Sequence, residues 1–288
     1  MSNLSGTGIW SSQLRYGDAG QAAEAAAELN ALGYSALWVP DVGGDLFGAL
    51  DNLLGATTTT TIATGILNLW MHTPAEAAAA YDQLTTDHGR RLLVGIGVSH
   101  APLIDRKAPG TYTKPLQQMT DYLDGLDAAD PPMPVEHRCL AALGPKMLEL
   151  AKSRTAGTHP YLVAPEHTAT TRERLGAGPL VAPEQGVVLE SDPDKARAIA
   201  RLHLSTYIGL PNYFNNWERI GLTEADRADG GSDRLVDALV AWGDEGAIAE
   251  RVQAHRDAGA DHVCVQVLTD DPARFPRDEW SRLAPALV

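Results

Sequence analysis

The chain has 288 residues, 44% of them hydrophobic, which is typical of one α/β barrel domain with a large core. Its formal net charge is −14, so its overall electrostatic field repels nucleic acids and anionic lipids, and we expect neither as a partner. Cys139 and Cys264 lie within apolar runs, which predicts two buried thiols rather than a disulfide or a metal site.

The sequence lacks a targeting or membrane-spanning pattern. Its first residues contain no basic segment followed by an apolar core, and no apolar run approaches the roughly 18 residues of a membrane-spanning helix. Together with the two expected free thiols, this favours a cytoplasmic protein.

Runs with strand character alternate with Ala-rich helical segments along the whole chain. In chain order, the predicted strands and the helices that follow them are 6–10 with 18–32, 35–40 with 45–56, 61–69 with 75–88, and 91–98 with 114–128. The later ones are 137–143 with 145–154, 158–163 with 165–175, and 186–191 with 192–208, and a helix at 244–258 precedes the eighth strand at 261–268. Asp18 is placed to cap the first helix, and Gly33 to end it.

This alternation predicts the fold class. Strands that alternate with helices form a parallel sheet, because each crossover between parallel strands needs a covering helix. Eight such units favour a closed (β/α)₈ TIM barrel over an open sheet, with residues 1–288 as a single domain. Residues 209–233 interrupt the rhythm with aromatic and Asn residues, and we expect an inserted helical lid there.

Polar residues follow several predicted strands, where a barrel of this kind carries its chemistry. These residues are Asp41, Asn68, His72, Ser99, His100, and the groups Leu143-Gly144-Pro145 and His159-Pro160-Tyr161. Each position alone also has a structural explanation, since an Asp after a strand is often a helix cap and a Gly-Pro pair often belongs to an ordinary loop. Their shared place at strand ends predicts a site on one rim.

Two of these positions have features that suit a bound ligand. Gly95 and Gly97 are followed by His100 where a dinucleotide fingerprint needs a third glycine, so the Rossmann signature is incomplete. The two glycines instead suit a strand end that a flat ring approaches closely. Backbone amides at Leu143 and Gly144 open a helix whose N-terminus favours a phosphate.

Other catalytic schemes have less support. The chain contains no G-x-S-x-G elbow, no H-E-x-x-H pair and no P-loop. A metal-dependent barrel hydrolase stays an alternative, in which Asp41, His72, His100 and His159 would converge on the ion, although we expect no metal. The histidines within predicted helices are expected at the surface or at caps: His88, His203 and His255.

Several motifs together resemble the bacterial luciferase-like oxidoreductases, in particular an actinobacterial branch that uses the deazaflavin coenzyme F420. They are WVPD at 38–41, GIGVSH at 95–100, ALGPKMLELA at 142–151, HPYLVAPEH at 159–167 and APEQGVVLE at 182–190. The resemblance implies a barrel that holds the deazaflavin ring in its mouth. The residues that it places at the coenzyme are Asp41, Gly65, Ile66, Asn68, Val98, Leu143, Gly144, His159, Pro160 and Tyr161.

The resemblance implies an enzyme that moves hydride between F420 and a small organic substrate, as a homodimer, with a cis peptide at Gly65-Ile66. His100 is the first candidate for a catalytic residue, as an imidazole with a pKa near neutrality, and His72 and His159 compete for that role. His100 stands where sugar-phosphate-oxidising relatives have a catalytic glutamate, and Val42 where they have a histidine, so the resemblance does not extend to that substrate. The alternatives are an FMN-dependent luciferase-like monooxygenase and a deazaflavin-binding protein without turnover.

Overall fold

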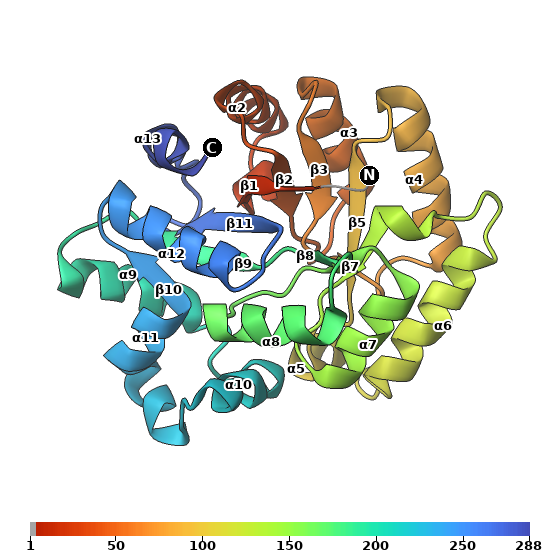
Figure 1. Ribbon diagram of the computed structural model, residues 1–288. Coiled ribbons are helices and arrows are strands. Elements are labelled where there is room, and N and C mark those ends of the chain that lie inside the picture. The colour runs from red at the N-terminus through yellow and green to blue at the C-terminus, as the bar shows by residue number, and fades with distance from the viewer. Residues whose placement is uncertain (1–3) are drawn as a thin grey trace.

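The computed structural model describes residues 4–288, apart from the side chain of Lys107 (Figure 1). Within them, parallel strands form one sheet: β1 Gly6–Trp10, β2 Ala36–Val39, β3 Thr61–Thr64, β4 Leu67–Asn68, β5 Leu92–Gly97, β6 Arg138–Leu140, β7 Gly157–Thr158, β8 Leu180–Val181, β9 Glu184–Val188, β10 Val240–Trp242 and β11 His262–Val267. The α-helices are α1 Gln13–Tyr16, α2 Ala19–Leu32, α3 Leu46–Ala56, α4 Pro74–His88, α5 Ala101–Lys107, α6 Pro115–Asp127, α7 Pro145–Arg154, α8 Pro165–Leu175, α9 Pro193–Leu204, α10 Pro211–Trp217, α11 Asp233–Leu239, α12 Glu245–Asp257 and α13 Arg277–Leu287.

The sheet curls round on itself. The strands follow the order β10-β9-β11-β1-β2-β3-β5-β6-β7-β8, with β4 paired to β5. The segment between β8 and β9 bonds to both neighbours, because Ala182 N donates to Thr158 O at 2.9 Å and Pro183 O accepts from Cys264 N at 2.8 Å. β8 and β9 therefore act as one interrupted strand between β7 and β11, and the predicted (β/α)₈ barrel is confirmed.

The strands differ from the prediction in the second half of the barrel. The sixth strand is only Gly157–Thr158, because Pro160 lies two residues further on and Leu162 has a φ of 52°, a value incompatible with an extended strand. The seventh begins at Leu180 rather than at residue 186, and Pro183 interrupts it. β10 was not predicted; among the described strands it pairs with β9 alone, on the edge of β9 opposite β11.

The helices agree more closely with the predicted segments. Asp18 caps α2 by accepting a hydrogen bond from Gln21 N at 3.0 Å, and Gly33 ends the helix with a φ of 92°, a conformation that glycine adopts readily. The periodicity did not indicate four additional helices, α1, α5, α11 and α13. The predicted insertion is helical, since α10 and two short 3₁₀ segments lie between 211 and 230.

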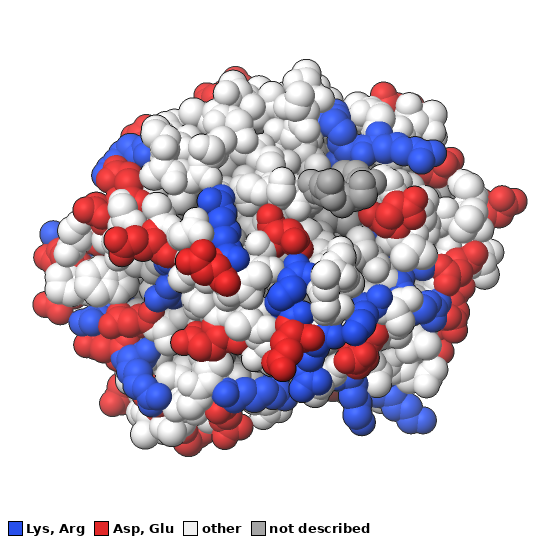
Figure 2. All heavy atoms as spheres, in the orientation of Figure 1, with Lys and Arg blue, Asp and Glu red and all other residues white. Residues whose placement is uncertain are grey.

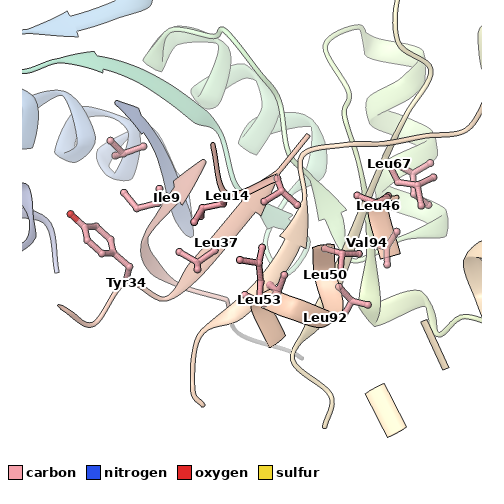
Figure 3. Packing of buried hydrophobic residues seen from close by; sticks show 14 of the residues in the cluster. Ile9, Leu14, Tyr34, Leu37, Leu46, Leu50, Leu53, Leu67, Leu92 and Val94 are labelled. Atoms are coloured by element: carbon pink, nitrogen blue, oxygen red, sulfur yellow. The ribbon is translucent and has the colours of Figure 1, made fainter. Parts of the chain in front are cut away.

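Apolar side chains fill the space between the sheet and its helices. Leu50 and Leu53 of α3 lie in one buried cluster with Leu37 of β2 and with Leu92 and Val94 of β5 (Figure 3). Each of these leucines is at most 1% exposed. Burial of such a side chain stabilises the fold by about 1.5–3 kcal/mol, so this cluster holds the strand ends in register.

The surface carries both signs of charge. On the face seen in Figure 2, Lys and Arg side chains are interspersed with Asp and Glu. The two cysteines are free and buried, as predicted. Across residues 4–288, none of the helices has the length and apolar character needed to cross a membrane.

Candidate active site

A cavity of about 550 Å³ opens at the carboxyl ends of the strands. Such a volume is typical of cofactor and substrate sites. Nine of the residues that the motifs placed at the site line it: Asp41, Gly65, Ile66, Asn68, Val98, His100, Leu143, His159 and Tyr161. Gly144, Pro160 and His72 are not among its lining residues.

The cavity floor consists of Gly65 and Ile66 together with Asp41 and Asn68. The Gly65-Ile66 peptide is cis, as the resemblance implied, and its carbonyl at Gly65 accepts a hydrogen bond from Trp10 Nε1 at 2.9 Å. A Cβ atom on Gly65 would lie 2.7 Å from Trp10 Nε1, closer than real side chains approach. Glycine is therefore required here by the packing of the floor.

Asp41 organises the polar edge of the floor. Its Oδ2 atom accepts a hydrogen bond from Asn68 N at 3.1 Å and lies 3.0 Å from His72 Nε2, while Gly43 N donates to Oδ1 at 3.3 Å. Asn68 Oδ1 accepts from Trp70 N at 3.1 Å. Within the described chain, Asn68 Nδ2 has no hydrogen-bond partner, so it remains a donor for a ligand.

His159 presents a buried acceptor next to the floor. Its Nδ1 atom donates to Ala182 O at 2.7 Å, and its ring stacks on Trp38 with 4.0 Å between centroids. Burial lowers the pKa of His159 to about 4, so the ring is neutral at pH 7. Nε2 is therefore an acceptor, and it has no partner in the part of the chain that the structure describes. A Cβ on Gly65 would lie 2.8 Å from it, which places His159 against the floor.

His100 lies at the rim of the cavity, where it precedes α5. Its ring centroid is 4.8 Å from that of Tyr213, and its Nδ1 atom is 3.5 Å from Asn212 Nδ2. Burial lowers the pKa of His100 to about 4. The expected pKa near neutrality is therefore wrong, because the rim removes water from the imidazole. At pH 7 His100 is a neutral hydrogen-bonding group.

One wall of the cavity is aromatic and combines Tyr161, which the motifs indicated, with three residues that they did not. This aromatic wall consists of Trp10, Tyr161, Tyr207 and Tyr213. Tyr161 lies 5.4 Å from Trp10 and 5.5 Å from Tyr207 between ring centroids, and Tyr207 lies 5.5 Å from Tyr213. Trp10 ends β1, so its place was recognisable as a strand end. Tyr213 lies in the insertion and Tyr207 in the turn before it. For both, the only signal in the sequence was the local density of aromatic residues.

A buried carboxyl group lies behind this wall. Glu184 is fully buried, its Oε2 atom accepts from Leu162 N at 3.0 Å, and its Oε1 atom has no partner in the described chain. Burial raises the pKa of Glu184 to about 8. In front of it, the Tyr161 hydroxyl donates to Gln266 Oε1 at 2.7 Å and lies 3.2 Å from His203 Nε2. His203 thus contacts the wall rather than sitting on the surface as expected.

The predicted phosphate site lies at the start of α7. Gly144 is the N-cap residue, and no side chain caps the helix. Its φ is −96°, and a Cβ on it would meet nothing within 4 Å. The fold therefore does not require glycine at this position. Lys146 lies exposed in the first turn of the same helix.

The metal site of the hydrolase alternative, which needed Asp41, His72, His100 and His159 to converge, does not form in the described part of the chain. Among the described residues, no group of three or more His, Cys, Asp or Glu side chains is placed to hold a metal ion. His255 is fully buried and bonds to Thr168 and Gln185, so the prediction of a surface or capping role was wrong. His88 does lie near the surface, 2.7 Å from Asp51.

Comparison with known proteins supports the resemblance that the motifs indicate. Residues 3–138 match the family described as luciferase-like monooxygenase. A search of curated proteins finds no match to the chain.

Solved structures of related fold cover nearly the whole chain. One is an F420-dependent secondary alcohol dehydrogenase in complex with an F420–acetone adduct, with a TM-score of 0.76 and 16% identity over 98% of both chains. Another is the coenzyme F420-dependent tetrahydromethanopterin reductase from Methanopyrus kandleri, with a TM-score of 0.75 and 16% identity over 99% of this chain and 98% of that one. A third is the oxygenating constituent of 3,6-diketocamphane monooxygenase from Pseudomonas putida in complex with FMN, with a TM-score of 0.69 and 14% identity over 99% of both. The luciferase-like fold is thus confirmed.

Proposed function

We propose that this protein is an oxidoreductase that uses coenzyme F420. The premise is the match of residues 3–138 to the luciferase-like monooxygenases. The cavity at the strand ends would hold the deazaflavin ring against Gly65 and Ile66. When bound, the coenzyme supplies a ring carbon that gives or takes a hydride. The observation that carries the proposal is the buried acceptor His159 Nε2, which has no partner in the described chain, next to Asn68, whose Oδ1 atom is already bonded and whose NH₂ group is left for a ligand.

These two atoms fit the polar edge of a flavin-like ring. Such an edge alternates carbonyl oxygens with an N–H group, so it needs both a donor and an acceptor. Asn68 offers the donor and neutral His159 the acceptor. Without a ligand, His159 Nε2 stays buried with no hydrogen bond, which costs free energy.

The start of α7 suits the phosphate end of the same coenzyme. Gly144 leaves open space at the N-terminus of this helix, where backbone amides favour an anion, and Lys146 adds a positive charge nearby. No Lys or Arg lines the cavity among the described residues, so only the uncharged ring is expected to enter it.

Structural similarity supports the choice of F420 over FMN. The two F420-dependent enzymes superpose with TM-scores of 0.76 and 0.75, against 0.69 for the FMN-containing monooxygenase. FMN-dependent oxygenation remains the second candidate, because the matching family is described as monooxygenase and one of the similar solved structures is a monooxygenase in complex with FMN.

A titration tests the coenzyme directly. Trp10 lines the cavity and Trp38 stacks on His159, so a bound ring is expected to quench their fluorescence. Saturable binding of F420, tighter than that of FMN and of nicotinamide coenzymes, supports the proposal. Binding of FMN alone, with oxygen consumption in the presence of reduced FMN, would assign the protein to the monooxygenases. Binding of F420 without bleaching by any substrate would favour a carrier without turnover.

Homodimerisation and a cytoplasmic location stay predictions. Light scattering of the purified protein tests the first.

A further inference from the structure

The part of the cavity above the floor is aromatic and lacks cationic side chains. The aromatic wall supplies three tyrosine rings, with 5.5 Å between the centroids of Tyr161 and Tyr207 and of Tyr207 and Tyr213. Trp10 joins this wall to the floor, because its Nε1 atom donates to Gly65 O. Among the described residues that line the cavity, none is Lys or Arg. Arg15 bonds the carbonyl of Gly43 at the rim but is not a lining residue.

The ionisable groups that do line the cavity disfavour an anion. The Asp41 side chain is fully buried and bonds to backbone N–H groups and to His72, and it forms no ion pair with a Lys or Arg of the described chain. Burial keeps His100 and His159 neutral, since it lowers the pKa of each to about 4. A carboxylate or phosphate that entered would lose its water without gaining a counter-charge, which is unfavourable.

The wall nevertheless offers one place for a polar atom. The Tyr213 hydroxyl has no hydrogen-bond partner in the described chain, and the Tyr213 ring lies 4.8 Å from that of His100. These neighbouring groups can meet a carbonyl or hydroxyl oxygen. Flat rings stack favourably on the remaining tyrosine faces.

We propose that the substrate is an uncharged aromatic or conjugated cyclic compound that carries a carbonyl or hydroxyl group, bound on the aromatic wall with its oxygen at Tyr213 and His100. This substrate class rests on the proposed function, because it assumes that the coenzyme ring occupies the floor. The polarised carbon of such a compound is the kind of centre that can accept or give a hydride.

Binding to the protein without coenzyme tests this class. The probes are 2-acetylnaphthalene and 6-acetyl-2-naphthoate, which differ by one carboxylate. We expect the neutral probe to bind at least about tenfold more tightly, by titration calorimetry or ligand-observed NMR. Equal or tighter binding of the carboxylate would overturn the proposal.

Three variants locate the probe and identify the cause of the preference. Tyr207→Leu is expected to weaken the neutral probe about fivefold or more, whereas Tyr16→Leu, at a tyrosine that lines the rim outside the wall, is expected to leave it unchanged. Val42→Lys introduces a cation at a lining residue that is 65% exposed, so it is expected to strengthen the carboxylate probe severalfold without affecting the neutral one. An equal effect of the two tyrosine variants, or no response to Val42→Lys, contradicts the proposal.

The outcome separates the substrate class from the coenzyme. If F420 does not bind but the neutral probe is still preferred, the proposed function fails and the substrate class stands. If F420 binds and both probes bind equally, the substrate class fails and the proposed function stands.

Discussion

His72 Nε2 lies 3.0 Å from Asp41 Oδ2, and the Asp41 side chain is fully buried whereas that of His72 is 15% exposed. Because His72 does not line the cavity, this contact positions the carboxylate rather than reaching a ligand. The same carboxylate oxygen fixes the backbone of Asn68. The His72–Asp41 pair therefore links the outer surface of the barrel to the polar edge of the floor.

The first prediction concerns this pair. His72→Ala leaves one oxygen of Asp41 without a side-chain partner, so we expect a loss of about 1–3 kcal/mol of stability and weaker coenzyme binding. His72→Gln keeps an N–H donor and is expected to recover most of both. Urea unfolding and a fluorescence titration measure the two effects. Wild-type values for His72→Ala would show that Asn68 and the remaining contacts hold Asp41 alone.

The second prediction places the phosphate. Asp and Asn have nearly the same shape and both suit an N-cap, so Gly144→Asp and Gly144→Asn are expected to fold alike. Only the Asp variant puts a negative charge at the start of α7. We expect it to weaken F420 binding at least about tenfold more than the Asn variant does, with a difference that shrinks in high salt. Equal affinities would move the phosphate away from this helix.

The third prediction follows from Glu184, whose pKa is raised by burial from 4.5 to about 8. Between these values the folded protein keeps a proton that the unfolded chain has released, so the free energy of unfolding falls as pH rises. The slope reaches about 1.4 kcal/mol per pH unit, and the effect levels off above the folded pKa. Glu184→Gln mimics the neutral acid at every pH.

We therefore expect Glu184→Gln to gain stability relative to the wild type as pH rises. Urea unfolding of both proteins at about pH 5, 6.5 and 8 checks this. The difference in unfolding free energy should be smallest at the lowest pH and largest at the highest. A difference that does not change with pH would mean that Glu184 ionises normally in the folded protein.

The strand ends were the predictable part of the site. Side chains that follow parallel strands gather at one end of a barrel, so Asp41, Asn68 and His100 could be assigned to one cavity from their place in the repeat alone. The caps of α2 were predictable for a similar local reason, since Asp18 and Gly33 act within a turn of their own position.

The aromatic wall and the protonation of its neighbours depend on tertiary contacts. Tyr207 was predicted within the helix 192–208 but lies beyond the end of α9 at Leu204, and Tyr213 lies in the insertion. Nothing in their local pattern shows that the chain folds them back over the mouth. The pKa of His100 depends on that covering, because burial is the cause of its shift. That the seventh strand already begins at Leu180 and continues past Pro183 is likewise visible only from its hydrogen bonds to both neighbours, not from periodicity.

The fourth prediction concerns His100, which remains the candidate for contact with substrate. Since burial lowers its pKa to about 4, it is neutral across physiological pH and donates or accepts a hydrogen bond without carrying charge. Its ionisation is therefore expected to leave no inflection in kcat between about pH 6 and 8.

Replacement of His100 separates hydrogen bonding to the substrate from support of the neighbouring ring. His100→Ala removes both, and with a substrate from the probe series we expect kcat to fall about 10²-fold, a loss typical of removing a donor to a reacting oxygen. His100→Gln keeps an N–H group and is expected to recover part of that rate, and F420 affinity should stay near the wild-type value in both. If His100→Ala retains kcat within about threefold while the neutral probe binds less tightly, His100 serves to hold Tyr213 in the aromatic wall and the reacting oxygen is met by the Tyr213 hydroxyl alone.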